Sequence, residues 1–208
     1  MVRCHGHEVV LARAVENRDS HAMNHPRIDA SRIVIRRGEA ADAAAIAAFG
    51  ERTFLETFGP ANDPAHIRAY LDQAFGLAQQ SAELADPDTT ILLATVDDEL
   101  VAYAQLRRGP LPECVAHADA IELQRFYLDH HTHGSGLAST LMDEVRATAA
   151  ALAATHVWLG VWENNPRAIA FYAKCGYADV GSKTFDVGTD RQVDRVMVAP
   201  LVNAFHRT

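Results

Sequence analysis

The sequence predicts one mixed α/β domain, for which a chain of 208 residues is long enough. Three observations lead to this prediction. Hydrophobic residues make up 49% of the chain and charged residues 22%, so the chain can bury a core and is neither disordered nor fibrous. Segments of strand-like composition alternate with segments of helical periodicity. Their order is β, helices, ββ, β, α, β, α, ββ, which requires both hairpins and crossover connections.

Three regions are expected along the chain. Residues 1–31 show little periodicity and are interpreted as an N-terminal extension, within which Met23 is an alternative functional start. Residues 32–200 form the folded domain, and residues 201–208 form a C-terminal tail. No internal repeat and no low-complexity linker divides the domain further.

The first elements of the domain are a short strand and three helices. Residues 33–35 are β-branched and predict the strand. After a glycine break, Asp42 can cap an alanine-rich helix that runs to Phe58. Apolar residues at helical spacing then predict a helix over 63–75 and a shorter one over 78–85.

The second half of the domain begins with a hairpin. Residues 89–96 form one strand, Asp97 and Asp98 form a tight turn, and residues 100–106 form the partner strand. A proline-containing loop over 109–118 follows. The remaining predicted elements are a strand over 121–128, a helix over 137–154, a strand over 156–161, a helix over 166–175, and a closing hairpin with strands over 177–187 and 194–198.

The charge balance of the chain is acidic. Lys and Arg number 19 and Asp and Glu number 27, which gives a formal net charge of −8. Nonspecific binding of nucleic acid depends on Lys and Arg displacing counterions from phosphates, so a nucleic-acid partner is not expected. An acidic protein attracts small cations, although many soluble proteins are acidic for solubility alone.

Cysteine use and targeting signals predict a soluble, cytoplasmic protein. Cys4, Cys114 and Cys175 are odd in number and widely spaced, so they give no disulfide framework. The apolar stretch from Val9 to Ala12 is too short for the core of a signal peptide, and no segment has the ~18 apolar residues of a membrane span. No membrane partner is expected, and a homodimer is left open.

A glycine-containing turn from His133 to Ala138 lies between a predicted strand and a predicted helix. It suits a pyrophosphate, because glycine allows close approach and a helix start offers unpaired N–H groups; it also fits simple helix entry. A dinucleotide-binding unit would place the turn in its first βαβ unit, with an acidic residue about 20 positions later. Here four strands precede the turn, and apolar residues around Trp158 occupy that position. A Walker-type loop also fails, because no Lys-Ser or Lys-Thr pair follows the glycines.

A second segment, from Trp158 to Tyr177, completes the pattern. Its apolar strand ends at Asn165, before a helix that Pro166 opens and Gly176 ends. Together the two segments resemble the GCN5-related N-acetyltransferase (GNAT) superfamily, with its signatures Q/R-x-x-G-x-G/A and V-x(3)-N-x(2)-A-x(2)-F-Y-x(3)-G-F. The residues that match the second signature are Val161, Asn165, Ala168, Phe171, Tyr172, Gly176 and Tyr177. The resemblance covers residues 32–200.

The resemblance implies the GNAT fold, a central mixed and mostly antiparallel sheet flanked by helices, with acetyl-CoA as co-substrate. The pyrophosphate would lie on backbone N–H groups, so His133, where the family usually carries Gln or Arg, weakens a side-chain contact without abolishing the site. The pantetheine would lie along a strand backbone like an added strand. Asn165 would order the cofactor amide, and Lys174 would meet a CoA phosphate or face water. The implied cofactor-binding residues are Phe126, Tyr127, Leu128, His133, Gly134, Ser135, Gly136, Leu137, Ala138, Asn165 and Lys174.

A narrower resemblance is to the bacterial spermidine/spermine N-acetyltransferases of the PaiA type. It rests on residues 53–59, 69–75, 158–163 and 184–194, although the first of these stretches fits ordinary helix core equally well. It implies transfer of acetyl to the primary amine of a small cationic acceptor, such as the polyamine spermidine, by direct attack in a ternary complex. An acceptor at a protein N-terminus, an antibiotic amine, and a CoA-binding module without catalysis remain alternatives.

Two proton transfers in this reaction need side chains. An amine with a pKa of about 10 is mostly charged at neutral pH and must lose a proton before it attacks. Glu122 shares one face of its strand with Gln124 and is the candidate base; an exposed strand carboxylate without a role is the alternative. Tyr172 matches the general acid of the superfamily, which protonates the leaving CoA thiolate. A backbone N–H near Leu128 is expected to stabilise the oxyanion.

No metal site is predicted. Cys4, His5 and His7 have no second cluster at a zinc-like spacing. The pair His130 and His131 belongs to a loop beside the phosphate site, where histidine is ordinary.

Overall fold

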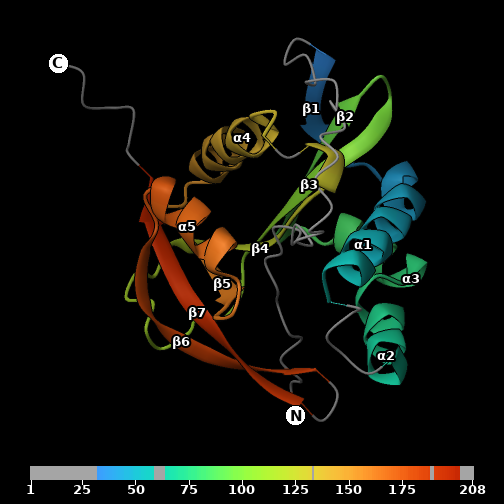
Figure 1. Cartoon of the computed structure of the whole chain (residues 1–208). Helices are drawn as coiled ribbons and strands as arrows, with labels where there is room; N and C mark the ends of the chain where they lie inside the picture. The colour runs from blue at the N-terminus through green and yellow to red at the C-terminus, as the bar shows by residue number, and fades with distance from the viewer. Residues whose placement is uncertain (1–31, 59–63, 133, 188–189, 202–208) are drawn as a thin grey trace, which may run out of the picture.

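Seven strands form one sheet in the described part of the chain, in the order β1-β2-β3-β4-β5-β7-β6 (Figure 1). The computed structural model describes residues 32–58, 64–132, 134–187 and 190–201, so the predicted extension and all of the predicted tail except Leu201 lie outside it. The strands are β1 (Ile33–Arg37), β2 (Thr89–Val96), β3 (Glu99–Arg107), β4 (Ala120–Leu128), β5 (His156–Trp162), β6 (Ala178–Val187) and β7 (Asp190–Pro200). The helices are α1 (Ala43–Phe58), α2 (Pro64–Ala74), α3 (Leu77–Ala85), α4 (Leu137–Ala151) and α5 (Pro166–Lys174).

The predicted architecture of a mixed, mostly antiparallel sheet flanked by helices is confirmed. Among the described strands, β4 and β5 are the one parallel pair. The hairpin between β2 and β3 is confirmed as well, since Asp97 and Asp98 have φ of 51° and 65°, the left-handed values of a two-residue turn. No helix in the described ranges is both long and apolar enough to cross a membrane.

The cap at Asp42 and the end of α4 differ from the prediction, whereas the other helix bounds agree within one residue. Asp42 closes a short 3-10 helix, Ala40–Asp42, that precedes α1. Its carboxylate accepts the N–H of Glu39 at 2.7 Å and pairs with Arg36 at 2.7 Å, so it caps this short helix and not α1 itself. Helix α4 ends at Ala151 because Ala153 takes a positive φ of 59°, for which the alanine-rich sequence gives no signal.

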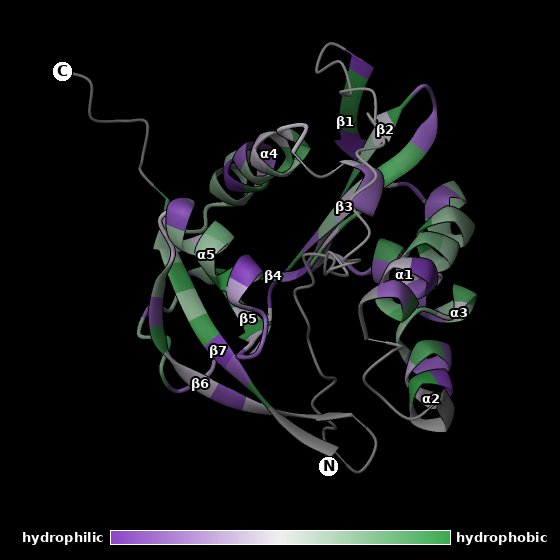
Figure 2. Ribbon diagram, in the orientation of Figure 1, coloured by the Kyte–Doolittle hydropathy of each residue, from purple (hydrophilic) through white to green (hydrophobic). Residues whose placement is uncertain are grey.

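Helices cover both faces of the sheet (Figure 1). On one face, α4 and α5 enclose a core that includes Leu141, Val145 and Tyr172. On the other face, α1 and α2 pack against Tyr103 and Tyr127. Hydrophobic and hydrophilic residues alternate along α1 and α2, as Figure 2 shows, which is why these helices bury one side each.

Strands β4 and β5 pair only at their beginnings and then separate (Figure 1). Their register runs from Ala120 opposite His156 to Glu122 opposite Trp158. From residue 123 to Leu128, β4 continues beside β3 with no strand on its other edge in the described part of the chain. The sheet therefore opens like a fork between β4 and β5.

A β-bulge in β4 lies where the fork opens. The register between β3 and β4 shifts beside Gln105, which leaves Gln124 as the extra residue. Gln105 donates to Gln124 Oε1 at 2.8 Å, and Arg125 Nη1 donates to Gln105 Oε1 at 2.8 Å. Arg125 also pairs with the buried Glu83 of α3 at 2.5 Å. This network fixes the bulge to α3, since breaking a buried ion pair costs about 3–5 kcal/mol.

Candidate active site

The edge of β4 that faces the fork offers main-chain donors. The N–H of Asp129 donates to the carbonyl of Val101, next to β3, at 2.9 Å. Backbone N–H groups alternate in direction along a strand, so those of Leu128 and Phe126 point into the fork. Of the three residues expected to line the pantetheine, these two provide such donors, whereas the N–H of Tyr127 points toward β3.

The glycine turn connects this edge to α4. Gly134 and Gly136 have φ of 80° and 90°, and a Cβ on either would meet nothing within 4 Å. The left-handed backbone, and not crowding within the chain, therefore requires glycine here. Ser135 Oγ donates to the carbonyl of Thr132 at 2.6 Å and accepts the N–H of Leu137 at 3.2 Å. The turn is held in shape by its own residues.

The start of α4 presents backbone donors beside this turn. The N–H groups of Ser139 and Thr140 are used, because both bond to the carbonyl of Gly136, at 3.0 and 3.1 Å. Within the described residues, the N–H groups of Gly136 and Ala138 have no acceptor. These donors and the positive end of the helix dipole fit an anionic group such as a pyrophosphate.

The first position of the glycine signature falls on His131. Counting back from Gly134 and Gly136 through Q/R-x-x-G-x-G puts the Gln or Arg position three residues before Gly134, so its assignment to His133 was wrong by two residues. His131 is exposed, and its backbone N–H donates to Asp129 Oδ1 at 3.0 Å. His133 lies outside the described residues.

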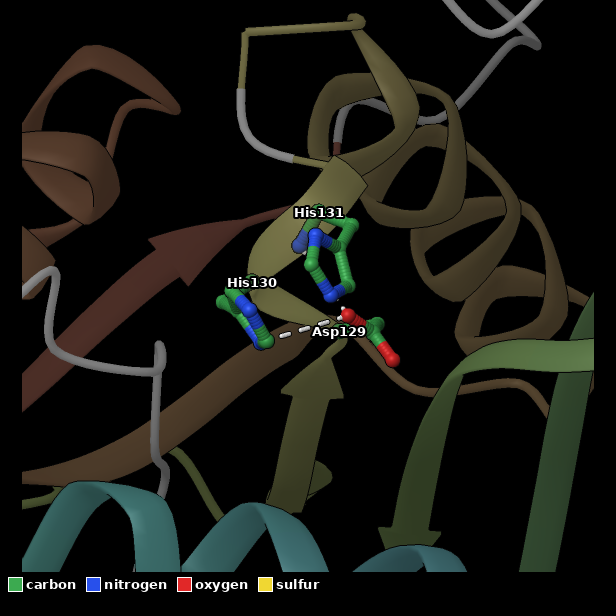
Figure 3. A group of neighbouring side chains, drawn as sticks. All are labelled: Asp129, His130 and His131. Atoms are coloured by element: carbon green, nitrogen blue, oxygen red, sulfur yellow. Dashed lines mark hydrogen bonds and ion pairs between the residues drawn. The ribbon is translucent and has the colours of Figure 1, made fainter. Parts of the chain in front are cut away.

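Asp129, His130 and His131 form a group whose potential ligand atoms lie within 4.8 Å of one another (Figure 3). Asp129 Oδ2 already pairs with Arg52 at 2.8 Å, and Oδ1 lies 3.4 Å from His130 Nδ1. Burial raises the pKa of Asp129, but the His131 N–H and Arg52 outweigh it and bring the pKa below its ordinary value. The Arg52 guanidinium already neutralises this carboxylate. We therefore interpret the three residues as stabilising the chain after β4 and not as ligands of a metal.

Tyr172 of α5 is fully buried against Phe126 and Tyr177. Its hydroxyl has no hydrogen-bond partner among the described residues. Burial, with smaller effects of Tyr177 and Cys175, raises the pKa of Tyr172 well above its ordinary value, so the phenol is protonated at neutral pH. Since an unsatisfied buried donor costs about 1–3 kcal/mol, this hydroxyl fits an acceptor that comes from outside the chain.

Glu122 lies at the point where β4 and β5 still pair, opposite Trp158. It is 5% exposed, so the alternative of an exposed strand carboxylate is wrong. Burial raises the pKa of Glu122 to about 7, while Lys183 and Arg107 act to lower it and Asp194 adds to the rise. A pKa near neutrality suits a group that accepts and releases a proton.

The two candidate catalytic side chains lie on opposite faces of the sheet. Tyr172 packs in the core beneath α4 and α5. Ile121 and Leu123 belong to that same core, so the intervening Glu122 points to the opposite face, on which α1 and α2 lie. A molecule bound in the fork would have a proton donor on one side and a proton acceptor on the other.

Asn165 and Lys174 lie at the two ends of α5. Asn165 Oδ1 caps the helix by accepting the N–H of Ala168 at 3.1 Å, which accounts for an asparagine there; its contact with the cofactor stays a prediction. Lys174 is exposed and, with Arg146 of α4, lines a pocket of about 540 Å³ between the two helices.

The sequence patterns give no role to Gly160, Lys183 and Asp194, which lie in the neighbourhood of Glu122. Gly160 did carry a signal, because glycine inside an apolar strand marks a bulge or a close approach. Lys183 carried none, and Asp194 entered only as the end of a stretch used for the narrower resemblance. The pairing of β6 with β7 and of β7 with β5 brings both residues to this place.

Comparisons with known proteins agree with this geometry. Residues 52–177 match the acetyltransferase (GNAT) family. An uncharacterized N-acetyltransferase of Mycobacterium tuberculosis is 41% identical over 161 residues, which cover 77% of this chain and 99% of that protein. The crystal structure of PaiA N-acetyltransferase from Thermoplasma acidophilum in complex with coenzyme A has a TM-score of 0.66 at 19% identity, over 81% of this chain and 98% of its own. A spermidine N-acetyltransferase chimera from Vibrio cholerae and hSSAT has a TM-score of 0.59 at 17% identity, over 82% of this chain and 96% of its own. These two structures share the fold.

Proposed function

The chain belongs to the GNAT family of acetyltransferases, and from this membership we propose that residues 32–200 transfer acetyl from acetyl-CoA to the primary amine of a small cationic acceptor of the polyamine type. One observation carries the proposal. Two buried titratable groups, Tyr172 and Glu122, flank the fork between β4 and β5 from opposite faces. An amine acetylation needs such a pair, one group to accept the proton of the ammonium and one to protonate the thiolate that leaves.

The residues around the fork fit acetyl-CoA, which supplies an acetyl group activated as a thioester. The N–H of Leu128 would hold the pantetheine, and the N–H groups of the glycine turn and the start of α4 would hold the pyrophosphate. Lys174 offers a cation for a further phosphate. The unsatisfied hydroxyl of Tyr172 is the donor that a sulfur in the fork would engage.

Two side chains move the protons in this proposal. Glu122 accepts a proton from the acceptor ammonium, directly or through one water, and so frees the lone pair for attack. Tyr172 donates its phenolic proton as the thiolate departs, and its raised pKa keeps that proton in place until then. The backbone N–H of Phe126, the donor on this edge that lies nearer to Glu122 along β4, would stabilise negative charge on the acetyl oxygen, two residues from the predicted position near Leu128.

A cationic acceptor is supported by the charge of the chain and by the name of one structure that shares the fold. The net charge of the chain is −8, and Glu122 and Asp194 bring buried carboxylates to the acceptor side of the sheet. The name of the spermidine N-acetyltransferase chimera points the same way for that protein. The odd, widely spaced cysteines fit a cytoplasmic enzyme.

A panel of amines tests the proposal. Release of the CoA thiol is measured with acetyl-CoA and, in turn, spermidine, spermine, putrescine, an aminoglycoside and a peptide with a free N-terminus. The proposal expects the highest kcat/KM with a polyamine. Preference for the peptide or the aminoglycoside would overturn the polyamine acceptor, and CoA binding without turnover of any amine would leave a binding module in place of an enzyme.

The dependence of the rate on pH should follow Glu122. The base must be deprotonated to work. We therefore expect kcat/KM to be low at acidic pH and to rise with pH through a midpoint of about 7. Because the ammonium is the form that gives its proton to Glu122, loss of that proton from the free amine, with a pKa of about 10, should lower kcat/KM at higher pH. Steady-state rates across the pH range check this, and the midpoint near 7 should be absent from the residual activity of Glu122→Gln.

The glycine turn should be sensitive to a single methyl group. Gly136→Ala forces an alanine into a left-handed backbone with φ of 90°, at a cost of about 1–2 kcal/mol, or moves the N–H groups away. We expect CoA to bind roughly tenfold more weakly, as measured by isothermal titration calorimetry. Gly109→Ala is the matched control, because its Cβ also meets nothing within 4 Å and its φ is not positive. Equal CoA affinity in the two variants would contradict the role of the turn.

A further inference from the structure

A lysine on the outermost strand reaches the candidate base across the sheet. Strand β6 lies at the edge, and β7 and β5 separate it from β4. Lys183 Nζ of β6 nevertheless lies 3.7 Å from Glu122 Oε1 of β4. Because neighbouring strands are about 4.8 Å apart, the lysine side chain must extend over both intervening strands to do so.

Gly160 of β5 makes room for this side chain. A Cβ on Gly160 would lie 2.5 Å from Lys183 Cε and 2.8 Å from Nζ, so any other residue would displace the ammonium. Gly160 does not have a positive φ, and the backbone therefore does not require glycine here. The missing side chain serves the passage of the lysine.

The ammonium of Lys183 lies between an aromatic ring and two carboxylates. Its Nζ is 5.2 Å from the centroid of the Trp158 ring, within the range of a cation–π contact. Asp194 Oδ2 lies 3.1 Å from the position that a Gly160 Cβ would take, on the same side as the ammonium. Asp194 is fully buried, and neither of its carboxylate oxygens has a hydrogen-bond partner among the described residues.

Charged groups from three strands act on Glu122. Lys183 of β6 and Arg107 of β3 favour the carboxylate, and Asp194 of β7 opposes it. Burial is the largest effect and favours the neutral acid, which cannot accept a proton. Of the two cations, Lys183 is the one that stands in ion-pair contact with the carboxylate.

On the basis of the proposed role of Glu122, we propose that Lys183 is a positioning residue for acetyl transfer: admitted by Gly160, its ammonium orients the Glu122 carboxylate and keeps it in its charged, proton-accepting form. Asp194 is a second buried carboxylate on which the charge of the same ammonium acts. The acceptor amine then meets a buried base that is charged at lower pH than burial alone would allow.

Three substitutions test the proposal through the pH profile. Lys183→Met should move the acid limb of kcat/KM upward by roughly one pH unit or more, because a close opposite charge lowers a carboxyl pKa by 1–3 units. Gly160→Ala, which keeps the lysine but fills its path, should move the limb in the same direction. Asp194→Asn should move it downward, since that carboxylate opposes the charge on Glu122. At high pH the rate of Lys183→Met should return toward that of the wild type.

A matched control and a direct titration separate the outcomes. Arg195→Met removes a half-exposed cation of β7 that pairs with Asp179. The acid limb of kcat/KM in this variant should stay at the wild-type pH. A titration of the Glu122 carboxyl by ¹³C NMR, assigned with Glu122→Gln, measures the same pKa without any assay. An unmoved pKa in both Lys183→Met and Gly160→Ala would overturn the positioning role. If that pKa moves while Glu122→Gln keeps full activity, the base assignment fails and the effect of Lys183 on Glu122 stands.

Discussion

Replacement of Tyr172 by phenylalanine is expected to lower kcat by about 10²-fold or more and to leave the affinity for CoA nearly unchanged. The ring of Tyr172 packs against Phe126 and Tyr177 in the core, and phenylalanine keeps these contacts. What the substitution removes is a hydroxyl that bonds to no described residue, so the folded state loses no hydrogen bond among them. The effect should therefore fall on the proton transfer to the thiolate.

Tyr177→Phe is the matched control for this experiment. Tyr177 is buried beside Tyr172, but its hydroxyl contacts Met142 Sδ at 3.6 Å and so has a partner within the chain. Rates under acetyl-CoA saturation, CoA affinity by calorimetry, and the free energy of unfolding are measured for both variants. A kcat for Tyr172→Phe equal to that of Tyr177→Phe would remove Tyr172 from the mechanism.

Glu122→Gln should lower kcat/KM for the amine by roughly 10²–10⁴-fold at a pH where the wild-type carboxylate is charged. Glutamine keeps the size of the side chain, and so its place at the start of the fork, but cannot accept a proton. Because the amide stays neutral, the acid limb near 7 should disappear as well. CoA affinity should not change, since Glu122 points away from the face on which α4 and α5 pack.

Two further variants sharpen this result. Glu122→Asp keeps a carboxylate on a shorter side chain and should be faster than Glu122→Gln. A purely structural role would favour glutamine instead, because glutamine keeps the size of the side chain. Glu99→Gln changes an exposed glutamate at the start of β3 and should leave the rate intact. Retention of the wild-type pH profile in Glu122→Gln would show that another group takes the proton.

The fold was predictable because its signals are local. The turn at Asp97 and Asp98, the helix start at Pro166 and the periodicity of the helices each depend on neighbouring residues. The boundaries were less accurate where no local signal exists, as at the end of α4, where Ala153 turns the chain without a glycine. The course of β4 away from β5 depends on a bulge that the pattern of apolar residues does not reveal.

The candidate site was predictable only in part. Gly136 and Tyr172 belong to spacings that a family resemblance recognises, and the burial of both Tyr172 and Glu122 was then a structural finding. Lys183 could not be found in this way, because three strand pairings set its distance from Glu122. The contact also depends on Gly160, which has no side chain to block the lysine. Contacts across several strands leave no mark in a local pattern.

The direction of the backbone at Phe126 and Leu128 has an evolutionary consequence. Their N–H groups face the fork, while their side chains are buried in the core with α4 and α5. Selection on these side chains therefore acts through packing, and any apolar residue of suitable shape keeps the main-chain donors in place. Mutational drift can change the identity of both residues without touching the surface that the co-substrate would contact, so this part of the binding site can diverge in sequence while its geometry is inherited.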